Sequence, residues 1–160
     1  MRNTARTWLR KRPALIVTTT LAAATITLTA APSAAAEPGF LSSCSYSHVA
    51  CKNGAKVSVP SPYNRCETAG SSVGSTQVCV LYDGDVVYVK DGSADGRSAL
   101  GTIVATSGVE YRICRNPHGS GTWAKCTWNW GESAKKTVQG GVKQSAALAS
   151  YNNLWSFTSN

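Results

Sequence analysis

The chain has 160 residues, with 16 Lys or Arg against eight Asp or Glu, a formal net charge of +8 at pH 7. Five of the 16 basic residues lie in the first 12 positions, so the rest of the chain has 11 basic and eight acidic residues, a formal charge of +3. A nucleic-acid-binding face needs clustered Lys and Arg, and after residue 36 only Lys135 and Lys136 are adjacent. We therefore expect no nucleic-acid partner.

Residues 1–36 have the order of a secretory signal peptide. Basic residues up to Arg12 precede an uncharged, largely apolar run over 13–31, and Ala34 and Ala36 fit an A-x-A cleavage site just before Glu37. The alternative is a single uncleaved membrane span, which needs about 20 apolar residues. The small residues after the apolar run favour cleavage, so we expect a secreted, extracellular protein that leaves the membrane.

Cleavage would leave about 124 residues, which is enough for one domain with one core. We assign 37–43, which carries Phe40 and Leu41, to a flexible N-terminal arm before the first cysteine. The remaining residues, 44–160, are expected to form a single disulfide-stabilised β domain.

All six cysteines lie in this second region. An even number of cysteines in an oxidising compartment indicates up to three disulfides, each stabilising the fold by about 2–4 kcal/mol. Six cysteines allow about 15 complete pairings, and we favour pairs that are neighbours in sequence. The cysteines are Cys44, Cys51, Cys66, Cys79, Cys114 and Cys126.

The strongest local signal is a β-hairpin. Residues 55–59 are a short strand candidate and 61–76 are rich in turn residues, but 78–82 and 85–90 are rich in β-branched and aromatic side chains. Asp83 and Gly84 separate these two runs and favour a tight turn. Both faces of the hairpin are largely apolar, so we expect it to lie centrally in a sheet.

A second hairpin is predicted from 109–115 and 123–130, after a strand over 99–106. Merging the apolar faces of these two runs separates Cys114 from Cys126, whereas pairing the cysteines sets charged residues opposite tryptophans. A β-bulge would reconcile the two demands. Residues 132–160 favour a strand or short helix and a closing strand over 154–157. The fold class is therefore all-β, a small disulfide-stapled sandwich or barrel-like domain built from hairpins.

Catalytic and metal-binding candidates are few. His48 lies in a C-x3-H-x2-C pattern typical of zinc sites, but cysteines of a secreted chain are expected to be oxidised. Glu110, Arg112 and His118 supply the residue types of a small ribonuclease. Residues 91–96 resemble the start of a calcium-binding loop without its closing Glu, and 70–74 match G-x-S-x-G without the α/β context. We assign no catalytic residue, no metal and no cofactor.

The tryptophans are more distinctive. Trp contributes a large apolar area with little entropy to lose, so several in a small domain indicate either a core or a binding surface. Alternation places Trp128 and Trp130 on one face and Trp123 on the other. The binding-surface candidates from the tryptophans and the apolar arm are Phe40, Leu41, Trp123, Trp128 and Trp130.

The segments 87–99 and 121–126 resemble small cysteine-containing secreted proteins of Streptomyces-type actinobacteria. The chain is also similar to the connector subunit of the umbrella toxin particles that such bacteria secrete. That resemblance implies a non-enzymatic adaptor that links a lectin-bearing subunit to a toxin subunit, and it carries over no catalytic residue.

The sequence therefore predicts a secreted, non-enzymatic protein-binding module. It would act as an adaptor in an extracellular, antibacterial toxin assembly or as a protein inhibitor, with an extracellular protein as its partner. The alternative is a small secreted hydrolase such as a ribonuclease, and the third hypothesis is a carbohydrate-binding module with a glycan ligand.

Overall fold

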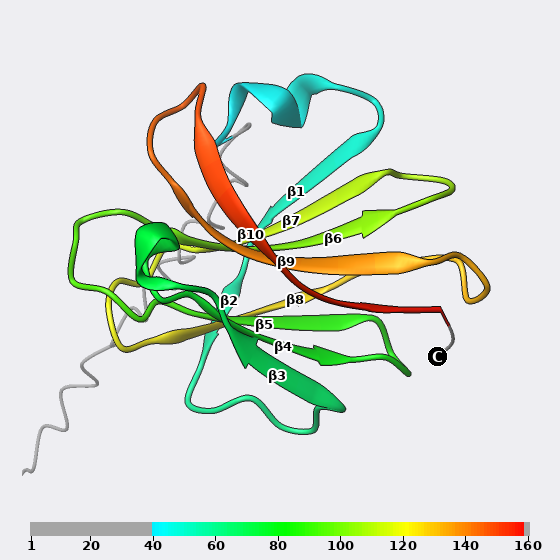
Figure 1. The fold of residues 1–160 in the computed structure, drawn as a ribbon, viewed down its shortest axis with the longest axis horizontal. Helices are drawn as coiled ribbons and strands as arrows, with labels where there is room; N and C mark the ends of the chain where they lie inside the picture. Colours follow the sequence, from blue (N-terminus) through cyan, green and yellow to red (C-terminus); the bar gives the residue numbers. More distant parts are fainter. Residues whose placement is uncertain (1–39, 159–160) are drawn as a thin grey trace, which may run out of the picture. The chain divides into compact units, whose positions relative to one another are not determined.

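Two five-stranded sheets face each other in residues 40–158, the part of the chain that this computed structural model describes (Figure 1). In order across sheet A, the strands are β1 (Val49–Asn53), β7 (Tyr111–Asn116), β6 (Ala99–Ala105), β9 (Lys136–Lys143) and β10 (Ala149–Phe157). In order across sheet B, they are β2 (Ala55–Val57), β8 (Trp123–Thr127), β5 (Val86–Lys90), β4 (Gln77–Leu81) and β3 (Arg65–Thr68). Two short 3-10 helices are η1 (Ser42–Ser45) and η2 (Ser71–Val73). The predicted all-β, disulfide-stapled sandwich is confirmed. The predicted signal peptide (1–36) lies outside the described residues.

The predicted hairpin of β4 and β5 lies inside sheet B, with β5 as its central strand. Its Val side chains enter the core between the sheets, and its second apolar face forms a cluster on the outside of sheet B. The turn differs from the prediction, because Asp85 leaves the strand and adopts a φ of 57°. Its carboxylate accepts a hydrogen bond from the Trp130 backbone amide at 2.9 Å. This contact is with a segment distant in sequence, so local turn preferences do not predict it.

The second predicted hairpin is wrong, since β7 belongs to sheet A and β8 to sheet B. The chain crosses between the sheets after Asn116, whose buried side-chain amide donates to the carbonyls of Val89 (3.1 Å) and Thr122 (2.8 Å). These bonds hold the end of β7 against sheet B. The register conflict disappears, because Cys114 and Cys126 enter the core from opposite sheets and need no shared ladder.

All three disulfides join cysteines that are neighbours in sequence, as predicted: Cys44–Cys51, Cys66–Cys79 and Cys114–Cys126. Three disulfides indicate an oxidising compartment. Cys114 and Cys126 have Cα atoms 5.9 Å apart, whereas packed sheets are usually about 10 Å apart. The sheets therefore approach each other closely at this corner of the sandwich.

The same corner contains the passage from β1 to β2. Only Gly54 separates the two strands, although they belong to different sheets. A Cβ atom at Gly54 would lie 2.8 Å from the Cβ of Ala124, so no larger residue fits there without a shift. Close backbone approach, rather than a turn, explains this glycine.

Residues 40–43 of the predicted flexible arm are packed against sheet A, which corrects that prediction. Phe40 and Leu41 are 7% and 4% exposed and form a cluster with Leu100 and Ile113 on the outer face of the sheet. The Ser42 amide also donates to the Ala146 carbonyl at 2.7 Å. The outer face of sheet A is apolar here because Ile113 alternates with the core-facing Cys114. Phe40 and Leu41 shield this apolar face from water. Residues 37–39 lie outside the described range.

Replacing Phe40 by alanine is expected to lower the free energy of unfolding by about 2–3 kcal/mol, because it removes a buried aromatic side chain from this cluster. Urea denaturation measures the change. Tyr63→Ala is the control, since Tyr63 is 49% exposed, and it is expected to change stability by less than about 0.5 kcal/mol. Equal stability of Phe40→Ala and Tyr63→Ala would contradict the packed N-terminal segment.

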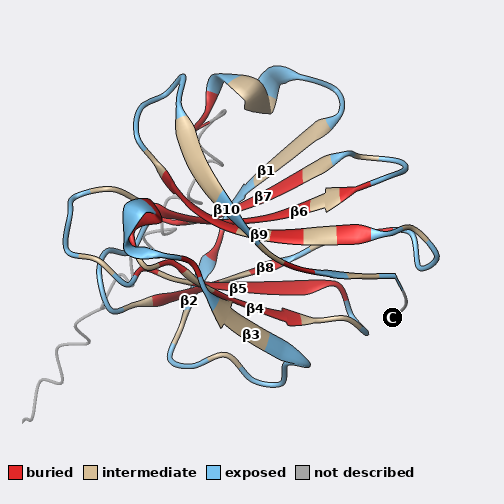
Figure 2. Ribbon diagram, in the orientation of Figure 1, coloured by how far each residue is buried: buried red, intermediate tan, exposed pale blue. Residues whose placement is uncertain are grey.

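Buried residues lie on strands of both sheets (Figure 2). The core between the sheets contains Val side chains from both sheets together with two tryptophans. Trp130 is 2% exposed and Trp155 is 6% exposed. Trp155 follows a β-bulge in β10, which shifts the register between Asn153 and Trp155. The C-terminal region 132–160 therefore contributes two long strands rather than a short helix.

Three charged groups are buried at one end of the sandwich. Arg112 donates to the carbonyls of Val109 (2.7 Å) and Asn129 (3.0 Å), and Lys136 donates to those of Glu132 and Ala134. Burial lowers the pKa of both cations, and the nearby Asp85 carboxylate opposes this effect. Lys136 has no exposed surface, and its Nζ also lies 5.1 Å from the centroid of the Phe157 ring.

Replacing Asp85 by asparagine is expected to cost about 2 kcal/mol of stability, because Arg112 loses the carboxylate that offsets its burial and Lys136 keeps only Glu132. Asparagine also tolerates the left-handed backbone at this position and keeps an acceptor for the Trp130 N–H, so the change isolates the charge. Guanidinium chloride unfolding measures it. Asp83→Asn in the same loop serves as the exposed control, and equal losses for both variants would refute the role of burial.

Candidate functional site

An open groove of about 350 Å³ lies on the outer face of sheet A. One part of its wall is formed by the segment from Leu41 to Val49, and another by the loop that joins β9 to β10. The floor comes from β7 and β10. The lining residues are Leu41, Ser43, Tyr46, His48, Val49, Tyr111, Ile113, Ala147, Leu148, Ala149 and Tyr151. None of them is Asp, Glu, Lys or Arg.

Aromatic rings dominate the first part of the wall. Tyr46 and His48 stack with ring centroids 5.6 Å apart, and His48 meets Tyr111 edge-on at 6.2 Å. The Cys44–Cys51 disulfide closes the segment that carries Tyr46 and His48. Tyr46 is 59% exposed, and Leu148 of the loop between β9 and β10 is 54% exposed. Two large side chains therefore flank the groove without being covered.

Tyr151 lies across the floor. A Cβ atom at Gly141 would lie 2.4 Å from the Cδ1 of Tyr151, so the ring rests directly on the backbone of β9. The Tyr151 and Thr102 hydroxyls are both buried, and neither has a hydrogen bond of good geometry within the described part of the chain. Burial raises the pKa of Tyr151, and the neighbouring Thr102 hydroxyl opposes this shift.

The groove can hold an uncharged group with an apolar face. Its apolar rings offer van der Waals contact and burial from water, and Ser43 and His48 offer polar atoms at the rim. The disulfide and the cover of Phe40 and Leu41 hold its wall in place before a ligand arrives, which reduces the entropy cost of binding.

The five binding-surface residues predicted from the sequence do not form an exposed surface, which corrects that prediction. Phe40, Leu41 and Trp130 are buried, and Trp123 is 9% exposed on the outside of sheet B with Lys90 above its ring. The half-buried Trp128 packs against the core, with Lys52 over its ring at 4.5 Å. The predicted faces are nevertheless right, because Trp128 and Trp130 contact the core and Trp123 does not.

Leu41 alone of those five lines the groove, whereas Tyr46, His48, Tyr111 and Tyr151 were not predicted as site residues. Their positions span more than a hundred residues of sequence, and no spacing rule joins them. The one sequence signal was the aromatic pair Tyr46 and His48 inside a short cysteine loop.

The described residues do not form the catalytic site that the ribonuclease hypothesis requires. Arg112 is buried and bonded to loop carbonyls near the start of β7, whereas His118 lies beyond the end of β7 and its Nε2 contacts the Gly54 carbonyl at 2.8 Å. Glu110 is exposed and interacts with the Tyr111 hydroxyl, which raises the pKa of Tyr111. The three groups do not converge on one site.

The pattern around His48 does not form a zinc site, because Cys44 and Cys51 are joined to each other in a disulfide. Within residues 40–158, no group of three or more His, Cys, Asp or Glu side chains is arranged to hold a metal ion. Ser72 of the G-x-S-x-G match lies in η2, a 3-10 turn without the strand and helix of a nucleophile elbow.

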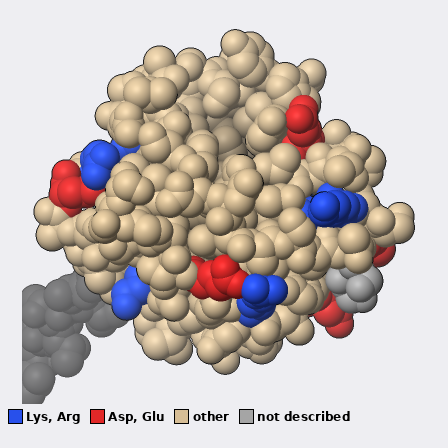
Figure 3. Space-filling view, in the orientation of Figure 1, with Lys and Arg blue, Asp and Glu red and all other residues tan. Residues whose placement is uncertain are grey.

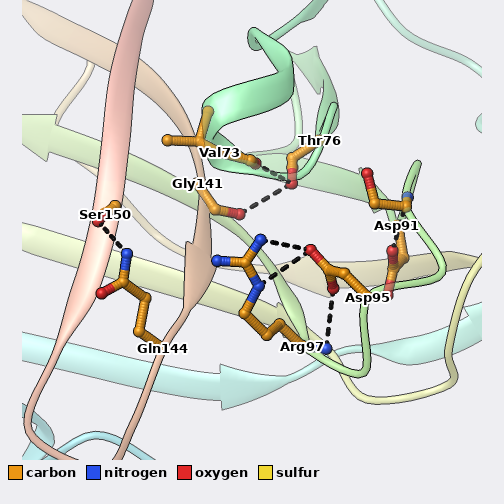
Figure 4. A network of polar contacts seen from close by, with 9 residues as sticks. Val73, Thr76, Asp91, Asp95, Arg97, Gly141, Gln144 and Ser150 are labelled. Atoms are coloured by element: carbon orange, nitrogen blue, oxygen red, sulfur yellow. Dashed lines mark hydrogen bonds and ion pairs between the residues drawn. The ribbon is translucent and has the colours of Figure 1, made fainter.

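The calcium-loop resemblance reflects a structural turn (Figure 4). Asp95 pairs with Arg97 at 2.6 Å, and these hydrogen bonds lower the pKa of Asp95. Asp91 is 3% exposed and accepts the Ser93 amide at 3.1 Å. Gly92 leaves no room for a side chain, because a Cβ would lie 2.2 Å from the Ser75 carbonyl oxygen.

Burial raises the pKa of Asp91 above its usual 3.8, although the bond from Ser93 opposes the shift. Because the pKa of Asp91 is higher in the folded protein than in the unfolded chain, its protonated carboxyl stabilises the fold at low pH. This stabilisation is lost as the pH rises through the folded-state pKa. We therefore expect Asp91→Asn to raise the urea midpoint near neutral pH, and the gain to vanish at about pH 3. The same gain at both pH values would contradict the shift.

Charged side chains are scattered on the face seen in Figure 3, with both signs interspersed. Two ion pairs join Arg65 to Glu67 and Arg97 to Asp95. The view contains no continuous patch of one sign.

No protein-family model, no curated protein and no solved structure matches this chain. In residues 40–158, the structure contains no helix with the length and apolar character needed to cross a membrane.

Proposed function

We propose that this chain is an exported, non-enzymatic protein-binding module that holds an uncharged, apolar part of a partner protein in the groove on sheet A. The groove carries the proposal, because it combines exposed anchors with an uncharged aromatic lining. Export is supported by the signal-like segment 1–36 together with three disulfides.

Tyr46 and Leu148 are the expected anchors. Both are large, more than half exposed and part of the groove lining, so a partner seated in the groove can cover both. Aromatic residues in such positions often dominate the binding free energy of an interface. The resemblance to connector subunits supports an adaptor in an extracellular toxin assembly as the specific form of this proposal, and a protein inhibitor is the other form.

Pull-down from culture supernatant with the tagged wild type, Tyr46→Ala and Tyr63→Ala tests the proposal. Tyr63 is exposed in the loop between β2 and β3 and provides the matched control. We expect a stoichiometric partner with the wild type and Tyr63→Ala, and at least about tenfold less with Tyr46→Ala. No stoichiometric partner, or equal recovery with all three proteins, would overturn the proposal.

A glycan is the second candidate ligand, because tyrosine rings along an open groove also stack on sugar faces. Titration of the purified protein with a glycan panel distinguishes the two. Saturable quenching of intrinsic fluorescence that Tyr46→Ala removes would favour a carbohydrate-binding module.

A further inference from the structure

The four edges of the two sheets are protected unequally. Edge strands expose unpaired backbone groups, and proteins usually guard them with charged residues, prolines or short length. β1 carries Lys52, the three-residue β2 carries Lys56, and β3 carries Arg65 and Glu67. β10 is nine residues long and contains neither a charged residue nor a proline.

β10 is also held in place over its first half. Side-chain hydrogen bonds join it to β9 and to the loop between β9 and β10. Gln139 donates to Asn153 (2.8 Å), and Gln144 donates to Ser150 (2.7 Å). The bulge at Leu154 begins only after this stretch. Residues 149–153 therefore form a regular edge of five residues.

The ladder shows which backbone groups face outward. The Gln144 amide donates to the Leu148 carbonyl at 2.9 Å, so Lys143 and Ala149 form a non-hydrogen-bonded pair. Alternation along the strand then directs the amides and carbonyls of Ala149, Tyr151 and Asn153 away from β9. Within the described residues, no backbone hydrogen bond joins β10 to a segment other than β9.

We infer that β10 pairs antiparallel with β10 of a second copy of this chain, so that the two sheets A become one continuous sheet across a twofold axis. Placing Tyr151 opposite Tyr151 of the second copy, and Ala149 opposite Asn153, pairs all the outward groups in about six backbone hydrogen bonds. The occupant is a second copy because the strand is uncharged and complementary to itself in this register.

The contact is small. A stable dimer usually buries about 800 Å² on each partner, and five paired residues bury less than this. We therefore expect a weak, concentration-dependent dimer. The inference does not depend on the proposed function, since it rests on the edge of β10 and not on binding in the groove.

Asn153→Pro tests the pairing. Proline removes the outward N–H of Asn153 and places a ring at the edge, while the bonds of Ser150 and Asn152 to β9 are kept. Asn153→Ser is the matched control, because it loses the side-chain bond to Gln139 and keeps the N–H. Thermal unfolding by circular dichroism checks that both variants fold.

Sedimentation velocity of the purified, disulfide-bonded protein over a wide concentration range gives the result. We expect reversible dimers of the wild type and Asn153→Ser, and a dissociation constant at least about tenfold higher for Asn153→Pro. A synthetic peptide with the sequence 149–157 should dissociate the wild-type dimer, and a scrambled peptide should not. A monomer at every concentration, or a dimer that the proline and the peptide both leave intact, overturns the inference.

Discussion

Replacing Cys114 and Cys126 together by alanine is expected to lower the free energy of unfolding by about 4 kcal/mol. The bridge closes a loop of modest length, which by itself restricts the unfolded chain by roughly 3 kcal/mol. Both residues are also buried, at 0% and 3% exposure, so their removal leaves a cavity in the core. Guanidinium chloride unfolding with and without reductant measures the loss.

The matched control is the double replacement of Cys44 and Cys51. These residues are half-buried and join η1 to β1 within one layer, so their loss is expected to cost about 2 kcal/mol. Cys114 and Cys126, by contrast, link the two sheets. Equal losses in the free energy of unfolding for the two double variants would contradict the larger contribution of the disulfide between the sheets.

Trp130→Ala is expected to cost about 4 kcal/mol, because the indole is 2% exposed and packs in the core beside Phe157. This prediction separates a core residue from a binding residue. A binding tryptophan can be removed without loss of stability, whereas a core tryptophan cannot. Thermal and chemical unfolding of the variant measure the effect.

Trp128→Ala provides the comparison for Trp130. Trp128 is only half-buried and its ring faces Lys52, so we expect a loss of about 1–2 kcal/mol. A larger loss for Trp128 than for Trp130 would contradict the assignment of the core.

The hairpin of β4 and β5 was predictable because its signals are local. Alternating Val residues specify which side chains share a face, and a sheet buried on both faces needs apolar residues on both. The facing of Trp123, Trp128 and Trp130 followed from the same period of two. The pairing of the cysteines in sequence order was also predicted, since short loops close most easily.

The route of the chain between sheets was not predictable in this way. Runs 109–115 and 123–130 have the appearance of a hairpin, but the Asn116 amide bonds to sheet B and the chain crosses there. Alternation defines two faces of a strand and says nothing about which sheet contains it. Exposure was misjudged for the same reason, because Phe40 and Leu41 are covered only once sheet A exists.

The candidate site shows this division most clearly. Tyr46, His48, Tyr111 and Tyr151 meet only after β1, β7 and β10 join one sheet, so long-range packing creates the groove.

By itself, the sequence determined the β class and the inward and outward faces of individual strands, since these depend on local periodicity. It favoured the pairing of neighbouring cysteines but did not determine that pairing. The tertiary structure decided which strands are neighbours, which aromatic rings are covered and which edge of a sheet is open. Those properties depend on contacts between residues far apart in the chain, and no local pattern encodes them.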